Sequence, residues 1–327
     1  MIEPLYREHG STLRALAYRM TGSAADADEI VQETFTRAIA SPPADGVTRN
    51  WLLAVGANLS RDHLRRRKRA AYVGPWLPSA IEAEGAPDAA DPERHYGLRE
   101  SASFAFLFAL EPLTSRQRAV LLLRDVFDLS VEETAEALNM REGAVRVMHH
   151  RARRALERYD EQRSLPTPER LGLVRGALER LASAVATGDP TQVQAVLAEH
   201  ATLYADGAGR FGAVRRVIRG AASIARLALF GRERRAGVPG RQALWSNVNG
   251  GPALVVDADP PPGTDIAPRV VLSCDTDEEG RITRLYVIAA PAKLTHLPAS
   301  EGFGLHQVHD GSQGHGDGPG QRPHGTE

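Results

Sequence analysis

The chain has 327 residues, enough for two or three domains, and its apolar (42%) and charged (25%) fractions are those of an ordinary globular protein. Its net charge of −1 gives no overall positive excess for nucleic acid, although positive charge is concentrated in short segments. The single cysteine, Cys274, excludes an intramolecular disulfide framework. No apolar run approaches the roughly 20 residues that cross a bilayer, and the N-terminus lacks the core of a signal peptide. We therefore expect a cytoplasmic protein without membrane contact.

The first seventy residues are predicted to be helical. In the segment 26–39, DADEIVQETFTRAI, one apolar face contains Ile30, Val31, Phe35, Ala38 and Ile39. The other face carries acid and amide groups, represented by Asp28, Glu29, Gln32 and Glu33. A second helix begins near Asn50 and ends in a basic cluster formed by Arg61, Arg65, Arg66, Arg67, Lys68 and Arg69. Between them, the loop 41–48 contains two prolines, which break the helical pattern.

Residues 71–102 are rich in Pro, Gly, Ala and acid, which is typical of a linker. The linker contains GPWLP at 74–78. A tryptophan between prolines is an unusual passive spacer, so we expect Trp76 to dock on another part of the protein.

The segment 129–156 fits two helices joined by a tight turn. Ser130 and Glu133 have the spacing of a capping box, and Asn139 falls where a left-handed backbone is needed. Apolar residues recur at helical spacing in the second helix, at Val145, Met148, Ala152 and Leu156. The pattern predicts a helix-turn-helix.

The opposite face of that second helix is cationic. The candidates for contacts with bases in a major groove are Arg146, His149, His150 and Arg153, and we expect Arg141 and Arg154 to hold phosphates. An ordinary helical hairpin with a solvated charged face is the alternative for this segment alone.

Beyond residue 168, the pattern changes from helices to mostly strands. Helices are predicted at 168–187, 191–200 and 214–234, with strands at ATLYAD, RQALWSNVN, PALVVDAD, PRVVLSCD and RITRLYVIAA. This order indicates an α+β domain over 168–297. The tail, 298–327, is rich in Gly, His, Pro and Gln and is predicted to be disordered.

Three blocks in chain order resemble bacterial extracytoplasmic-function (ECF) sigma factors of the sigma-70 family. They are DADEIVQETFTRA, WLLAVGANLSRDHLRRRKR and the segment LTSRQRAVLLLRDVFDLSVEETAEALNMREGAVRVMHHRARRAL. The resemblance implies region 2 at 1–70, for core polymerase and the −10 element, and region 4 at 103–160, for the −35 element. The implied partners are promoter DNA and core RNA polymerase, at the clamp of the β′ subunit and the flap of the β subunit.

The same resemblance implies roles for individual residues. Asp28, Glu29, Gln32 and Glu33 would meet the clamp, whereas Asn58 would line a pocket for a flipped −10 base. The basic cluster would hold single-stranded phosphates. The sequence shows no nucleotide-binding loop and no metal-ligand spacing, so we expect no catalytic residue, cofactor or metal.

Residues 168–297 resemble a SnoaL-like domain, the cone-shaped α+β fold of polyketide cyclases and steroid isomerases, on ATGDPTQVQAVLAEHATLYADG and LWSNVNGGPALVV. In ECF proteins with such an extension, a WLP-containing linker and two short motifs are thought to contact the sigma domains. The matching residues here are Trp76, Leu77, Pro78, Asp206, Gly207, Gly209, Arg210, Lys293 and Leu294. A small-molecule ligand of this domain is a further candidate partner.

Together these observations predict a multidomain protein with two all-α sigma domains followed by an α+β domain that tunes them in cis. A one-component helix-turn-helix regulator with a ligand-binding domain is one alternative. A less favoured alternative is an enzyme fused to a sigma-like module, with His200, Tyr204 and Asp206 as acid–base groups and Trp245 lining the cavity.

Overall fold

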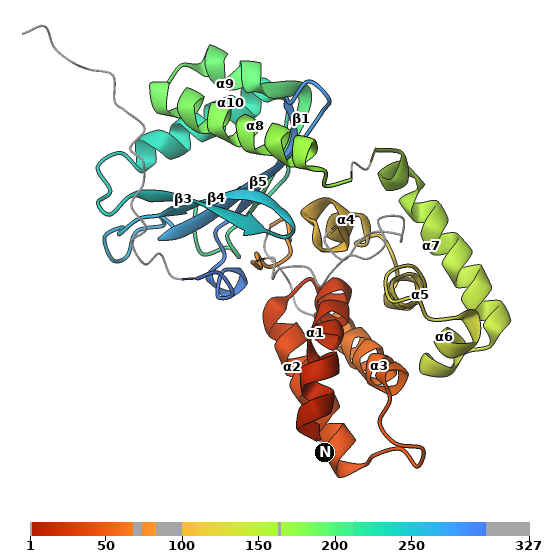
Figure 1. The fold of residues 1–327 in the computed structure, drawn as a ribbon. Coiled ribbons are helices and arrows are strands. Elements are labelled where there is room, and N and C mark those ends of the chain that lie inside the picture. The colour runs from red at the N-terminus through yellow and green to blue at the C-terminus, as the bar shows by residue number, and fades with distance from the viewer. Residues whose placement is uncertain (1, 68–73, 83–99, 163–164, 213, 299–327) are drawn as a thin grey trace, which may run out of the picture.

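The computed structural model describes residues 2–67, 74–82, 100–162, 165–212 and 214–298 (Figure 1). Its first unit consists of α1 (Ile2–Thr21), α2 (Ala24–Ala40) and α3 (Arg49–Arg67), which pack on one another. Ser23 caps α2 by accepting a hydrogen bond from the Asp26 amide. The predicted apolar face of α2 is buried except for Ile39, which is 66% exposed because it lies at the end of the helix, where the chain leaves the core.

The second helical unit begins with η1 (Glu100–Ala102) and α4 (Phe104–Ala109) and continues with α5 (Ser115–Asp125), α6 (Val131–Ala137) and α7 (Glu142–Gln162). Two buried arginines join it to α1. Arg118 of α5 donates to the carbonyl oxygens of Met20 and Leu110, each at 2.8 Å, and Arg19 donates to the Ser101 hydroxyl at 2.7 Å. These contacts connect α1 to the start of the second unit across the linker.

The capping box predicted at Ser130 is confirmed: its hydroxyl accepts from the Glu133 amide at 3.0 Å, and the Glu133 carboxylate accepts from the Ser130 amide at 2.6 Å. We expect Ser130→Ala to destabilise the first turn of α6 by about 1 kcal/mol, because an orphan amide loses its acceptor. Hydrogen exchange of the amides in 131–134 should accelerate, whereas exchange in α5 should not change. Unaltered exchange in 131–134 would contradict this expectation.

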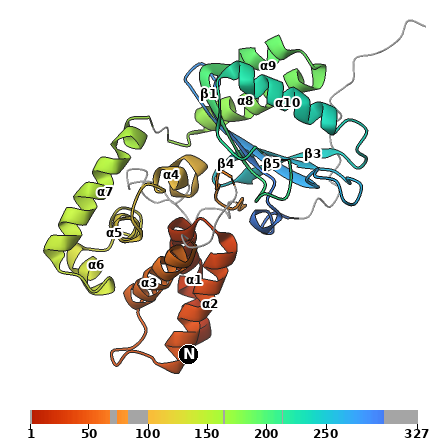
Figure 2. The ribbon, with the colours of Figure 1, turned by 180° about the vertical axis from the view of Figure 1, so that it is seen from behind.

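The third unit contains α8 (Pro168–Thr187), α9 (Pro190–Val196), α10 (Ala221–Arg234) and a six-stranded sheet with the order β2-β1-β6-β5-β4-β3. The strands are β1 (Leu197–Asp206), β2 (Ile218–Arg219), β3 (Gln242–Val248), β4 (Gly251–Asp257), β5 (Arg269–Thr276) and β6 (Ile282–Ile288). Strands β1 and β6 are parallel, and the other neighbouring pairs are antiparallel. The three helices cover one face of this sheet (Figures 1 and 2).

Two predicted helix boundaries were wrong. The second helix of this unit ends at Val196 instead of residue 200, because residues 197–206 pair as β1 with β6. The basic helix begins at Ala221 instead of residue 214, because Ile218 and Arg219 pair with β1 as β2. In both places sheet pairing replaced a locally helical pattern.

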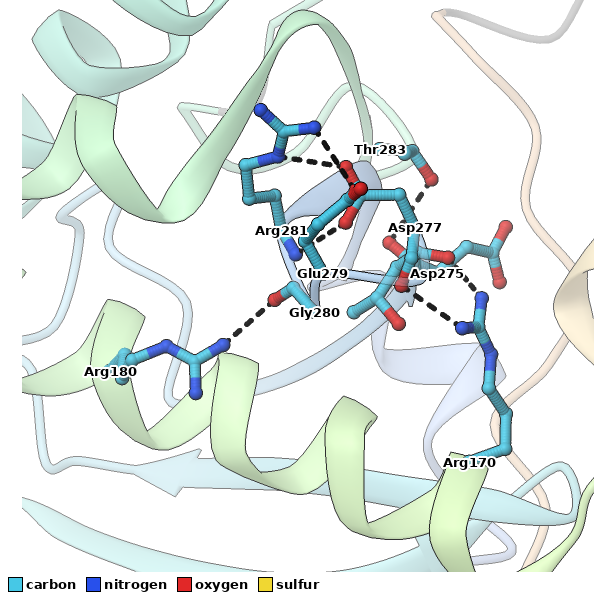
Figure 3. A network of polar contacts seen from close by, with 9 residues as sticks. Arg170, Arg180, Asp275, Asp277, Glu279, Gly280, Arg281 and Thr283 are labelled. Atoms are coloured by element: carbon cyan, nitrogen blue, oxygen red, sulfur yellow. Dashed lines mark hydrogen bonds and ion pairs between the residues drawn. The ribbon is translucent and has the colours of Figure 1, made fainter.

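Arginines attach α8 to the turn between β5 and β6, as Figure 3 shows. Arg170 donates to the carbonyl oxygens of Asp277, at 3.0 Å, and Thr276, and Arg180 donates to the Gly280 carbonyl at 2.8 Å. Within the turn, Arg281 pairs with Asp277 at 2.9 Å. The helix layer is thereby fixed to the end of the sheet.

The opposite face of the sheet packs on the linker and α4. Leu77 and Phe104 share a core with Tyr286 and other sheet residues. The ring of Phe104 lies 5.5 Å from that of Tyr286, and the ring of Phe108 lies 4.7 Å from that of Tyr204. The α+β domain therefore contacts the helical units through a buried apolar surface. A short helix, η2 (Pro291–Lys293), follows the sheet.

The observed order, two helical units and then an α+β domain, confirms the predicted fold class. The predicted disordered tail falls outside the described residues apart from Pro298.

Candidate nucleic-acid interface

The helices α6 and α7 form the predicted helix-turn-helix. Asn139 has φ of 51° at the turn, in the left-handed region expected for it. Val145, Ala152 and Leu156 of α7 are fully buried in the core that α7 shares with α5 and α6. The packing side of the second helix was therefore correctly identified from the sequence.

The outer face of α7 presents several of the predicted DNA-binding residues. Arg146, His150 and Arg154 are exposed, as is Arg141 just before the helix. Arg146 forms an ion pair with Glu142 one turn earlier, at 2.8 Å. An exposed pair of this kind is weak enough for a phosphate or a base to replace it.

Two other predicted groove residues, His149 and Arg153, turn inward in this structure. His149 Nε2 lies 2.7 Å from Asp125 Oδ1, and Arg153 lies 3.5 Å from Asp125 Oδ2. Asp125 is only 8% exposed, and a carboxylate with so little contact with water requires charged or hydrogen-bonding partners. The structure thus differs from the groove-facing arrangement expected for these two side chains.

On α3, the predicted −10 residues divide into engaged and exposed groups. The Asn58 amide donates to the carbonyl oxygens of Ala54, at 2.9 Å, and Ala137 of α6, at 3.1 Å, while its oxygen accepts from Arg61. Arg61 is half-buried, and desolvation, together with nearby Arg116 and Arg65, lowers its pKa.

The remaining −10 candidates are less constrained. Arg65 and Arg66 are exposed, and Arg67 is the last residue of α3. Lys68 and Arg69 lie outside the described residues. Arg65 pairs with Asp62 one turn earlier, an exposed pair that a phosphate could replace, and Arg66 is the second exposed arginine at this end of the helix.

Helix α3 is packed against the helix-turn-helix unit at its other end too. The Asn50 amide donates to the Glu133 carboxylate at 2.8 Å, and Arg49 donates to the Phe127 carbonyl at 3.1 Å. Together with the Asn58–Ala137 hydrogen bond, these contacts hold α3 along α6 over two turns or more of its length.

The acidic face of α2 is only partly open. Glu29 and Gln32 are exposed, and Glu33 pairs with Arg37 at 2.8 Å. Asp28 lies 2.6 Å from Arg14 of α1 and 2.7 Å from His296, which follows η2. Partial burial acts to raise the pKa of Asp28, but the hydrogen bonds from Arg14 and His296 outweigh it, so the pKa is lowered.

The linker motif is bound by the α+β domain. Lys293 Nζ lies 2.6 Å from Asp206 Oδ2 and donates to the Leu77 carbonyl at 2.6 Å. The same Asp206 oxygen accepts from the Leu77 amide at 2.8 Å. The ammonium of Lys293 also lies over the Trp76 ring, 4.3 Å from its centroid. Four of the predicted regulatory residues thus meet in one cluster, which we call the linker lock: Trp76, Leu77, Asp206 and Lys293.

The other predicted regulatory residues surround the linker lock or lie away from it. Pro78 is buried, and Leu294 belongs to the same apolar core as Leu77. Gly207 is buried in the turn after β1, where the Ala208 amide donates to Asp206 Oδ1 at 3.1 Å. Gly209 and Arg210 are exposed, so the end of that motif points to solvent.

The residues considered for acid–base catalysis do not form a site. Asp206 is part of the linker lock, and Tyr204 packs between Phe108 and Tyr286. His200 is exposed, and Trp245 lies beneath Arg175 of α8. The structure does not bring these groups into one cavity, which contradicts the arrangement expected for the enzyme alternative. Cys274 is buried, and burial raises the pKa of its thiol.

Several residues outside the predicted set connect the units, and three of them are Asn249, His296 and Arg118. Asn249, in the turn between β3 and β4, donates to the Tyr18 hydroxyl at 2.6 Å and to the Ala102 carbonyl at 3.0 Å, and it accepts from the Ile81 amide at 3.1 Å. His296 connects the extension to Asp28 of α2, and Arg118 connects α5 to the Met20 carbonyl of α1. Of these three, only Asn249 carried a sequence signal, because Asn-Gly between two strands is typical of a hairpin turn.

Two family models match the chain in the expected order. Residues 5–70 match "Sigma-70 region 2", and residues 103–156 match "Sigma-70, region 4". The ECF RNA polymerase sigma factor SigJ of Mycobacterium tuberculosis is 33% identical over 302 residues, which cover 90% of this chain and 93% of SigJ. This chain belongs to the ECF sigma factors.

Further relatives agree with this assignment. The crystal structure of M. tuberculosis SigJ superposes with a TM-score of 0.68 at 28% identity, over 90% of this chain and 99% of that one. SigG of the same species is 38% identical over 175 residues, which cover 47% of this chain and 46% of SigG. The similarity to SigJ therefore includes the α+β extension, whereas the similarity to SigG covers about half of each chain.

As an ECF sigma factor, the protein acts in promoter recognition and transcription initiation, with core RNA polymerase and promoter DNA as its partners. No described helix is both long and apolar enough to cross a membrane. Within the described parts of the chain, no three His, Cys, Asp or Glu side chains are grouped so that they could hold a metal ion.

Proposed function

We propose that the α+β extension restrains this sigma factor in cis by keeping regions 2 and 4 closed on each other and by covering part of the polymerase-binding face. The observation that carries the proposal is the 2.7 Å contact between His296 and Asp28. Asp28 is one of the four residues expected at the clamp of the β′ subunit, and the same side chain cannot meet the clamp while His296 occupies its carboxylate.

The closed arrangement of α3 and α6 supports the same proposal. Asn58 is expected to line the pocket for a flipped −10 base. In this structure its side-chain amide donates a hydrogen bond to the Ala137 carbonyl of α6. A base could use that amide only after α6 moved away from α3. Because region 4 must also reach the −35 element, separation of the two regions would serve both ends of the promoter.

Once regions 2 and 4 have separated from each other and from the extension, we assign a separate surface of the protein to each partner. Glu29 and Gln32, joined by Asp28 and Glu33, would contact the clamp, and region 4 would contact the flap of the β subunit. Arg65 and Arg66 would hold single-stranded phosphates. Arg146, His150 and Arg154 would enter the −35 major groove, with Arg141 on a phosphate, and His149 and Arg153 would join them after leaving Asp125. The protein would work in the cytoplasm, by binding and without catalysis of its own.

His296→Ala tests the restraint directly. We expect the variant to bind core polymerase about two- to fivefold more tightly, because a partly exposed pair of this kind contributes roughly 0.5 to 1 kcal/mol to the closed form. The measurement is a titration of fluorescently labelled full-length protein with sigma-free core polymerase, followed by transcription from a cognate promoter. High salt should reduce the difference between the variant and the unaltered chain.

Ala292→Ser is the matched control, because Ala292 is exposed on η2, one turn before His296, and its side chain makes no hydrogen bond or ion pair with His296 or Asp28. It should bind core polymerase as the unaltered chain does. Equal affinities for all three proteins would contradict the restraint, and loss of affinity in His296→Ala would mean that the extension assists polymerase binding.

A further inference from the structure

Positive charge in the extension is concentrated in one segment. Residues 207–241 contain nine arginines and a single carboxylate, Glu233, although the whole chain has a net charge of −1. The segment comprises the end of the turn after β1, the edge strand β2 and α10. The function proposed above uses none of these arginines.

A hollow of about 580 Å³ lies between β2 and α10, within this segment. Arg216 and Arg219 line it from the β2 side, and Arg226 lines it from α10. Its apolar surface includes Leu227 and Phe230, and Phe230 lies one helical turn after both Arg226 and Leu227. Phe230 is 53% exposed, and the Arg234 guanidinium lies 5.7 Å from the centroid of its ring, so an aromatic surface with cations around it faces solvent here.

The three lining arginines lack carboxylate partners among the described residues. Three other arginines of the extension are neutralised by carboxylates: Arg234 pairs with Asp265, Arg269 with Asp257 at 2.7 Å, and Arg281 with Asp277 at 2.9 Å. In the hollow, Arg226 donates to the Ser223 hydroxyl at 3.2 Å. Like charges gathered without a counter-ion repel one another, and a bound anion removes that repulsion.

We propose that this hollow binds a small organic anion, with a phosphate or carboxylate group held by Arg216, Arg219 and Arg226. Guanidinium groups match both anions with paired N–H donors. A flat apolar body would lie on Leu227 and Phe230. The volume is in the range of small-molecule sites, roughly 300 to 1,000 Å³, and such sites combine an apolar lining with a few charged groups.

The shape favours a small molecule over a DNA duplex. A duplex backbone is held by cations spread along an exposed surface. Here the cations surround apolar side chains. Within the described residues, the lining side chains make no hydrogen bond or ion pair with α1–α7 or the linker lock, so failure of this site would leave the proposed restraint intact.

The test uses isothermal titration calorimetry on the full chain with two naphthyl anions, 1-naphthyl phosphate and 1-naphthoate. Inorganic phosphate and 1-naphthol are titrated separately as the two halves of such a ligand, the anionic group alone and the ring alone. We expect at least one naphthyl anion to bind about tenfold or more tightly than either half, because the anion and the ring would be held together. Arg226→Ala should weaken that binding about tenfold, since a charge-assisted contact is lost. Phe230→Ala should weaken binding of the naphthyl anion but not of inorganic phosphate.

Arg215→Ala is the matched control, because Arg215 is exposed and next to Arg216 but does not line the hollow. Binding should be unchanged in it, and Arg216→Ala provides a second test if Arg226→Ala does not fold. The proposal is overturned if neither naphthyl anion binds, or if Arg215→Ala and Arg226→Ala weaken binding equally. It is also overturned if neither naphthyl anion binds but a non-promoter DNA duplex does, and if Arg226→Ala weakens that DNA binding.

Discussion

Replacement of Lys293 by Met is expected to detach the linker from the extension and to destabilise the closed form by about 3 to 5 kcal/mol. The Asp206 side chain has no exposure to solvent, and Lys293 supplies its cationic partner at 2.6 Å. Met has a similar length but no charge, so the carboxylate would stay buried without its counter-ion. The same change removes the donor to the Leu77 carbonyl and the cation above Trp76.

Two measurements on the full chain would detect this release. Hydrogen exchange of the Leu77 amide, which donates to Asp206, should accelerate strongly, and transcription with core polymerase should rise if the restraint is correct. Ala292→Met adds the same side chain at an exposed neighbouring position and should change neither quantity. The double variant Asp206→Leu, Lys293→Met should recover part of the lost stability, because it removes the unpaired charge. Unchanged exchange at Leu77 in Lys293→Met would show that the linker lock does not hold the linker.

The elements that could be predicted from sequence are those whose cause is local. The capping box at Ser130, the left-handed Asn139 and the buried side of α7 each depend on residues within one or two helical turns. The strands β3 to β6 were similarly marked by alternation and by turns of Gly and Asn. In these segments, local preference and the final fold agree.

The contacts between units could not be predicted in this way. His296 and Asp28 are 268 residues apart, and nothing near either residue indicates the other. The inward position of His149 has the same origin, because it depends on a nearly buried carboxylate on another helix, Asp125. Helical periodicity identified the polar side of α7 but not which of its polar residues would have a partner within the protein.

The arrangement expected for acid–base catalysis was wrong for a related reason. Tyr204 and Asp206 are two residues apart on β1, so they lie on one face of the sheet, as the strand pattern implies. The sequence does not say what covers that face. In the structure, α8, α9 and α10 cover the other face, and this one packs on the linker and α4. The two side chains therefore serve an interface: Tyr204 contacts Phe108, and Asp206 binds Lys293 and the Leu77 amide.

The turn between β3 and β4 should be as important for the assembly of the units as the linker lock. The Asn249 side chain is buried and bridges α1, the linker and the start of the second helical unit through Tyr18, Ile81 and Ala102. Asn249→Ala would leave these three groups without that partner, and an unpaired buried polar group costs about 1 to 3 kcal/mol. We expect a loss of at least about 3 kcal/mol in denaturant unfolding, since Ala also tolerates the φ of 54° poorly.

Two further variants separate the causes of that loss. Asn249→Gly accepts the left-handed backbone but lacks the amide, so it should lose nearly as much stability as Asn249→Ala if the hydrogen bonds dominate. Asn247→Ala, at an exposed position of β3 two residues earlier, should lose little. Because the Tyr18 hydroxyl also donates to the Ser79 carbonyl at 2.7 Å, loss of Asn249 should loosen the linker as well as the turn, and exchange of the Ile81 amide should accelerate with it. If Asn249→Gly were as stable as the unaltered chain, the left-handed backbone of the turn, and not its bridge to the helical units, would account for the effect of Asn249→Ala.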